Sequence, residues 1–139
     1  MKKEVLLKID NLSSGYGSTI IVNNFSFDVE KGQILAITGS NGMGKTTLMK
    51  TIMGLIDVRE GSIFFKNEDI TNSSPDYRSK SGIGYVPQGR EIFSALTVEQ
   101  NIMLPIYTRK KPSFDVSEKL EEIYSLFPIL KEKRSANGS

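Results

Sequence analysis

A glycine-rich segment at residues 39–47 contains residue types and a spacing that suit phosphate binding. Gly39 and Gly44 bracket four residues, and Lys45 and Thr46 follow at once, which fits the phosphate-binding loop pattern. Glycines allow a tight turn whose backbone N–H groups approach a polyphosphate with no Cβ in the way. The Lys45 ammonium can contact β- and γ-phosphate oxygens, and the Thr46 hydroxyl can coordinate Mg²⁺. The pattern therefore predicts a nucleotide-phosphate site.

The residues on either side of this segment favour a phosphate loop over a glycine-rich surface turn. The apolar run 33–38 ends at Gly39 and is typical of a strand buried on both faces. After the loop, apolar residues recur at helical spacing, and Gly54 follows where a C-terminal cap belongs. The start of a helix at the loop adds its positive dipole end to the anion site. The recurring apolar residues are Leu48, Met49, Ile52 and Met53.

Length, charge and composition exclude several other classes of protein. The 139 residues suffice for one compact domain, and the net charge of +2 at pH 7 does not indicate a nucleic-acid partner. The sequence has no cysteine and no histidine, which excludes disulfides, the usual zinc sites and an imidazole general base. It has no run approaching the about 18 apolar residues of a membrane span and no secretory h-region. We therefore expect a cytoplasmic protein.

Two alternating apolar patterns before the loop predict strands. Apolar residues alternate over 5–9 until the polar pair 10–11, and again over 25–29 against polar neighbours, which predicts a strand with one solvent face. Between them, the predicted loop 14–18 presents Tyr16 between two glycines. Tyr16 is either an ordinary turn tyrosine or a ring that stacks on a purine, and these residues alone favour neither role.

Further short elements are predicted after the loop helix. Residues 62–65 and 83–86 are apolar runs typical of strands, while Ser74 followed by Pro75 fits the N-cap and first turn of a short helix. Gln88 follows the second run. A glutamine at the carboxyl end of a parallel strand lies where ligands bind in open α/β sheets, although a loop glutamine is usually just solvated.

The C-terminal third of the sequence is helical in pattern. Residues 97–100 fit a capping box that opens a helix through about Leu104. Four apolar residues then recur at helical spacing before Pro128. We expect this stripe to pack in a core and not to bind a ligand. Its members are Val116, Leu120, Ile123 and Phe127.

Taken together, these segments resemble the amino-terminal half of an ABC-transporter ATP-binding subunit. More narrowly, they resemble the ATP-binding subunits of branched-chain (neutral) amino acid importers, and related urea or amide importers share much of the pattern. The resemblance covers nearly the whole chain. Its most specific part is Gly84-Tyr85-Val86-Pro87-Gln88-Gly89-Arg90-Glu91-Ile92-Phe93, and other matching segments are 15–17, 61–63, 69–71, 96–101 and 126–132. Met43 departs mildly, because the family more often has a small residue there.

The resemblance implies an α/β fold of the P-loop NTPase type. It implies a partial core sheet, an N-terminal antiparallel β part and the start of a helical subdomain. Residues 1–92 would form the β part and the phosphate-loop part of the nucleotide-binding domain. Residues 93–139 would begin the helical subdomain and end before the signature motif.

The resemblance also implies roles for particular residues. Tyr16 would stack on adenine, and Thr46 with Gln88 would hold Mg²⁺. Gln88 would in addition sense the γ-phosphate and the attacking water. The stretch 89–93 and the helices after it would face a membrane-embedded permease. The implied nucleotide-binding set is Tyr16, Gly39, Ser40, Asn41, Gly42, Gly44, Lys45, Thr46 and Thr47.

The implied partners are ATP with Mg²⁺, permease subunits at the inner face of the cell membrane, and a second ATP-binding subunit. The family's signature loop, the Walker B carboxylates and the switch histidine are not in these 139 residues. The resemblance implies a parent subunit that couples ATP binding and hydrolysis to uptake of branched-chain or other neutral amino acids. Because these motifs are missing, we expect a truncated chain, and the alternative function is a fragment that binds nucleotide without turnover. We expect it to form a homo-oligomer or to rearrange, which would cover unpaired strand edges. A small phosphotransferase on the same loop is disfavoured, because the sequence offers no arginine-rich lid.

Overall fold

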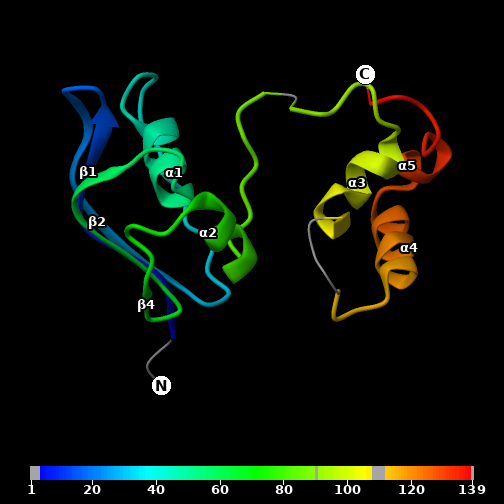
Figure 1. Cartoon of the computed structure of the whole chain (residues 1–139), viewed down its shortest axis with the longest axis horizontal. Helices are drawn as coiled ribbons and strands as arrows, with labels where there is room; N and C mark the ends of the chain where they lie inside the picture. Colours follow the sequence, from blue (N-terminus) through cyan, green and yellow to red (C-terminus); the bar gives the residue numbers. More distant parts are fainter. Residues whose placement is uncertain (1–3, 90, 108–111, 139) are drawn as a thin grey trace. The chain divides into compact units, whose positions relative to one another are not determined.

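The computed structural model describes residues 4–89, 91–107 and 112–138. They form two compact units, which divide between Val86 and Pro87. The first unit contains the β-strands β1 to β4 with the helices α1 and α2, and the second contains α3, α4 and α5 (Figure 1). The phosphate-loop segment therefore belongs to the first unit.

An antiparallel sheet with strand order β2-β1-β3-β4 is the scaffold of the first unit. β1 (Val5–Tyr16) pairs with β2 (Thr19–Glu30) on one side and with β3 (Val58–Phe65) on the other. The short β4 (Glu68–Asp69) pairs with the end of β3. The strands predicted before the loop and at 62–65 are therefore confirmed, and each is longer than the run of residues that predicted it.

The polar pair at residues 10–11 does not end β1, as the sequence pattern predicted. Asn11 has a φ of 48°, and the pairing of β1 with β2 shifts register between Ile9 and Leu12, as at a β-bulge. On β3, Gly61 faces this irregularity, because a Cβ there would lie 2.3 Å from Asn11 O. The predicted loop at 14–18 is correspondingly wrong in extent, since β1 continues through Tyr16.

α1 (Lys45–Met53) packs on the sheet and ends as predicted. Gly54 has a φ of 79°, its N–H donates to Thr51 O at 2.9 Å, and the Leu55 N–H donates to Lys50 O at 2.8 Å. This is the pair of bonds by which a glycine closes a helix. The apolar side chains of α1 join those of the strands in one buried cluster, formed by Ile9, Leu12, Val22, Leu48, Ile52, Ile63, Phe65 and Ile70.

The predicted short helix is α2 (Pro75–Ser81). Ser74 caps it, because the Ser74 Oγ accepts a hydrogen bond from the Tyr77 N–H at 3.2 Å. Arg78 of α2 is 2% exposed and is the largest fully buried side chain among the described residues. Its Nη1 donates to Thr51 O and Ile52 O, both at 2.8 Å, so α2 is fastened to the last turn of α1.

Two predicted strands do not form in the described residues. The runs 33–38 and 83–86 have no strand partner. Ile34 is 96% exposed and Val86 is 92% exposed. A strand exists only through hydrogen bonds to neighbouring strands, and the described residues offer these runs no neighbour. The apolar composition was recognised correctly, but the strand assignment was wrong for this structure.

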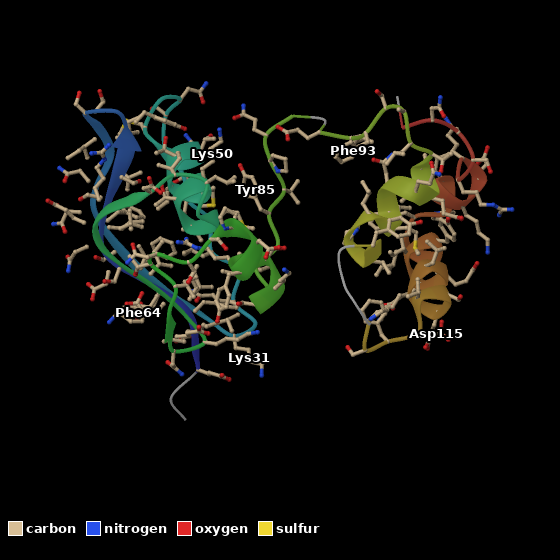
Figure 2. All side chains as sticks on the ribbon, viewed as in Figure 1. Lys31, Lys50, Phe64, Tyr85, Phe93 and Asp115 are labelled. Atoms are coloured by element: carbon tan, nitrogen blue, oxygen red, sulfur yellow. The ribbon has the colours of Figure 1, made fainter. Side chains whose placement is uncertain are left out.

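The first helix of the second unit begins with the predicted capping box. The Thr97 N–H donates to Gln100 Oε1 at 2.9 Å, and the Gln100 N–H donates to Thr97 Oγ1 at 3.1 Å. This reciprocal pair precedes α3 (Val98–Tyr107). Asp115, labelled in Figure 2, caps α4 (Val116–Leu126) by accepting from the Ser117 N–H at 2.8 Å.

The predicted apolar stripe of α4 is only partly a core. Val116, Leu120 and Ile123 are half-buried and line a hollow of about 220 Å³ together with residues of α3. Phe127 is 57% exposed, because α4 ends at Leu126 and the chain turns there into α5 (Pro128–Glu132). The buried aromatic residue of α4 is Tyr124, at 3% exposure.

Candidate functional site

The phosphate-loop segment leads directly into the amino terminus of α1. Gly44 is the N-cap residue, with a φ of 89°, and no side chain caps the first turn. The first N–H groups of a helix have no partners within the helix, so an uncapped first turn offers them to a ligand. The local backbone of the loop therefore fits an anion such as a polyphosphate.

Two glycines of the loop are required by its geometry. Gly42 has a φ of 84° and Gly44 a φ of 89°, in the left-handed region that other residues rarely adopt. A Cβ at Gly44 would in addition lie 3.0 Å from Cγ2 and 3.3 Å from the carbonyl oxygen of Ile21. Ile21 of β2 therefore packs directly against the loop at Gly44, and only glycine leaves room for this contact.

Lys45 folds back across the loop. Its Nζ donates to Gly39 O and to Ser40 O, each at 2.7 Å. These two carbonyls hold the ammonium against the first residues of the loop. A polyphosphate in the loop would offer this ammonium charged acceptors, with which hydrogen bonds are about twice as strong as with neutral carbonyls.

The other predicted loop residues differ in exposure. Asn41, Gly42 and Thr46 are exposed, whereas Thr47 is 6% exposed. Gly39 and Ser40 are exposed as well and supply the two carbonyls that accept from Lys45. All of them belong to one continuous segment of the first unit, so the structure keeps the predicted phosphate-binding set together.

Tyr16 lies at the end of β1 and is 50% exposed. It lines an open hollow of about 570 Å³, whose other lining residues are Gly15, Gly17 and residues 55–59, which lead from α1 into the start of β3. No residue of the phosphate loop lines that hollow. Tyr16 and the loop are linked through the β1–β2 hairpin, since β2 carries the Ile21 that contacts Gly44. Stacking of Tyr16 on adenine stays a prediction.

Gln88 belongs to the second unit, and Thr46 belongs to the first. Joint coordination of Mg²⁺ by this pair therefore stays a prediction. In the described part of the chain, no group of three or more Asp or Glu residues could hold a metal ion. The predicted permease-facing stretch 89–93 includes Arg90, which lies outside the described residues.

A buried hydroxyl pair behind the loop was not found from the sequence. Thr51 Oγ1 lies 2.8 Å from both Ser14 Oγ and Thr47 O. One hydroxyl donates one proton, so we assign a bond from Thr51 to the Thr47 carbonyl and one from Ser14 to Thr51. This pair ties α1 to β1. Small hydroxyl residues on a strand and a helix give no periodic pattern that would reveal it.

The sequence pattern that defines ABC transporters matches residues 22–138. The chain belongs to the ABC transporter family. Its ABC ATPase fold is also that of a solved ATP-binding subunit of an ABC transporter, with a TM-score of 0.81, 26% identity, and coverage of 95% of this chain and 54% of that one. The expected fold class is thereby confirmed, with its antiparallel β part and its few helices.

Two similar curated relatives are named as branched-chain amino acid transport ATP-binding proteins. One, from Archaeoglobus fulgidus, is 36% identical over 91% of this chain and 52% of its own length. The other, from Pseudomonas aeruginosa, is 34% identical over 92% and 54%. An Fe(3+) import ATP-binding protein from Fusobacterium nucleatum is also 34% identical, over 90% of this chain and 33% of its own. The chain thus spans about half the length of the two branched-chain relatives.

Proposed function

We propose that this chain is the nucleotide-binding part of an ABC importer's ATP-binding subunit. The observation that carries the proposal is the Lys45 ammonium, held by Gly39 O and Ser40 O at the uncapped start of α1. A cation, a helix N-terminus and a glycine-rich backbone converge there on one anion site. This convergence suits the β- and γ-phosphates of ATP.

The residues of the chain would act by positioning and charge stabilisation. The loop N–H groups and Lys45 would orient the γ-phosphate for in-line attack by water and would stabilise charge that develops on its oxygens. Thr46 and Gln88 would hold Mg²⁺, which supplies further neutralisation of the phosphate oxygens when it is bound. Tyr16 would hold the adenine by stacking.

The proposed transported solute is a branched-chain or other neutral amino acid. The support is that the two relatives just described are named for branched-chain amino acid transport. The Fe(3+) import relative is 34% identical to this chain as well. The proposed partners are permease subunits at the inner face of the membrane and a second ATP-binding subunit. None of the helices in the described residues has the length and apolar character of a membrane span.

Titration calorimetry of Mg·ATP, with phosphate release followed in the same samples, tests the nucleotide site. We expect the wild-type chain to bind and Lys45→Ala to lose at least about tenfold in affinity, because a charged hydrogen-bond donor to phosphate is removed. Lys50→Ala is the matched control, since Lys50 lies on the same helix outside the loop. Equal binding by wild type and Lys45→Ala would contradict the proposal.

A second candidate function is nucleotide binding without turnover in a self-associated chain. It is favoured by the fully exposed Ile34 and Val86 in runs without strand partners, which are templates for association. Sedimentation velocity separates the two candidates together with the phosphate-release assay. A monomer that releases phosphate supports the ATPase, and an oligomer that binds ATP without release supports the alternative.

A further inference from the structure

The sequence contains two Asn-Gly pairs, at residues 41–42 and 137–138. In such a pair the glycine nitrogen can attack the asparagine side-chain amide, because glycine has no Cβ to obstruct the approach and a freely turning backbone. The nitrogen forms a bond to Cγ and loses its proton, and the Cγ–Nδ2 bond breaks to release ammonia. Water then opens the cyclic imide at either carbonyl, which leaves aspartate or isoaspartate.

At the first pair the structure leaves the reacting groups accessible. Asn41 and Gly42 are both exposed in the turn before α1. A Cβ at Gly42 would meet nothing within 4 Å, so open space surrounds this backbone. Within the described residues, no hydrogen bond engages the Gly42 N–H. The attacking nitrogen is therefore unencumbered.

At the second pair, a hydrogen bond and close packing restrict the same groups. The Gly138 N–H donates to Leu96 O at 2.9 Å, and Asn137 forms a β-bridge with Thr97. A Cβ at Gly138 would lie 2.7 Å from Ile92 Cγ2, so the surroundings are filled. Ring closure here would first require breaking the bond to Leu96 and local opening of the unit.

We propose that Asn41 is a modification site at which spontaneous loss of ammonia disables the phosphate loop. The functional consequence rests on the proposed nucleotide binding. The new carboxylate would follow Ser40, whose carbonyl accepts from the Lys45 ammonium at 2.7 Å. A fixed anion at this place competes with polyphosphate for Lys45 and repels it. Isoaspartate would also lengthen the backbone and displace the loop N–H groups.

The same chemistry predicts protection by nucleotide. A polyphosphate in the loop accepts hydrogen bonds from its backbone N–H groups, so the loop loses the freedom that ring closure needs. Mg·ATP should therefore slow the reaction at Asn41 and leave Asn137 unaffected, since Asn137 lies in the second unit and outside the loop. Loss of ammonia from Asn41 would therefore be fastest when little Mg·ATP is available.

Peptide mapping of the 139-residue chain after warm, mildly alkaline incubation tests the assignment. Trypsin releases Asn41 in the peptide 32–45 and Asn137 in the peptide 135–139, and mass spectrometry detects the replacement of NH₂ by OH. In the folded chain we expect Asn41 to react at least about tenfold faster than Asn137, because its site needs no local opening. In urea the two rates should agree within about threefold. Equal rates in the folded chain, or a faster Asn137, would overturn the assignment.

The matched variants Asn41→Asp and Asn137→Asp test the consequence. By calorimetry, Asn41→Asp should bind Mg·ATP at least about tenfold more weakly than wild type, and Asn137→Asp within about twofold of it. Circular dichroism checks that both are folded. If Asn41 reacts selectively but wild type binds no Mg·ATP, the proposed function fails and the modification site stands. If wild type and Asn41→Asp bind equally well, the disabling effect is refuted.

Discussion

Arg78 closes the carboxyl end of α1 by donating from Nη1 to Ile52 O at 2.8 Å. A cation at this end complements the helix dipole and satisfies carbonyls that have no partner within the helix. The amino end of the same helix carries the phosphate loop. α1 is therefore fixed at its far end by a buried charge, while its near end stays open to an anion.

Gly54→Ala should destabilise the first unit more than Gly17→Ala does. Gly54 has a φ of 79°, and a Cβ there would lie 3.0 Å from Nε of Arg78. We expect a loss of about 3 kcal/mol in the free energy of unfolding, from backbone strain plus displacement of Arg78. Gly17→Ala is the control, because Gly17 also has a positive φ but meets nothing within 4 Å. Its loss should be about 1 kcal/mol. Urea unfolding measures both, and equal losses would refute the contact.

Arg78→Met should cost about 3 kcal/mol of unfolding free energy, because it leaves several buried carbonyls without donors. These include Ile52 O and Thr71 O, each of which accepts from Arg78 at 2.8 Å. Lys80→Met in the same helix is the control, since Lys80 is exposed and its ion pair with Asp76, at 2.6 Å, lies on the surface. That change should have little measurable effect. Amide exchange of the last turn of α1 should also accelerate in Arg78→Met alone, whereas protection unchanged there would argue against the closure described above.

Thr97→Ala should loosen the start of α3. Thr97 Oγ1 accepts from the Gln100 N–H at 3.1 Å, and loss of such a cap typically costs about 1 kcal/mol. Hydrogen exchange at Gln100 is the direct measurement, and it should become faster in the variant. Ser117→Ala serves as the comparison, because the cap of α4 is the side chain of Asp115, and it should leave exchange at Gln100 as in wild type.

The second unit should lose stability in alkaline solution through Tyr124. Burial, together with the hydrogen bond that its hydroxyl donates to Glu99 at 2.7 Å, raises the pKa of Tyr124 from 10.0 to about 12. The folded state therefore holds the phenol proton more tightly than the unfolded state. The resulting stability is complete below pH 10 and is lost as the pH rises through about 12. Unfolding of wild type and Tyr124→Phe across this range measures the effect, and the two profiles should converge at the alkaline end. Parallel profiles would contradict the assignment.

Local rules recovered the parts of this fold that depend on neighbours in sequence. Gly54, Ser74 and the Thr97–Gln100 box were predicted as helix ends, because caps involve residues three or four apart. The phosphate loop was predicted for the same reason. Residues 33–38 and 83–86 were predicted as strands from composition, but pairing depends on partners remote in sequence. Their apolar character does not supply those partners.

Features that link remote segments were not predictable from the pattern. Arg78 lies in a polar stretch where a basic residue usually faces solvent, and its burial follows from the carbonyls of Thr51 and Ile52. The hollow beside Tyr16 is lined by residues 55–59, about forty positions away in the sequence. The sequence indicated which residues suit nucleotide binding. The structure adds that β2 packs against the loop at Gly44 and that Arg78 holds the far end of α1.

The bulge at Asn11 also determines which face of the sheet the residues after it in β1 point to. In an uninterrupted strand, residues three apart point to opposite faces, yet Ile9 and Leu12 are both buried, at 1% and 0% exposure, in the same cluster. The extra residue of the bulge resets the alternation midway along β1. Deleting Asn11 would leave Ile9 and Leu12 two residues apart and on the same face of a regular strand. Keeping Asn11 but flattening the bulge would instead turn Leu12 away from the buried cluster. The bulge at this one exposed residue thus keeps the buried side chains Ile9 and Leu12 on the same face of the sheet.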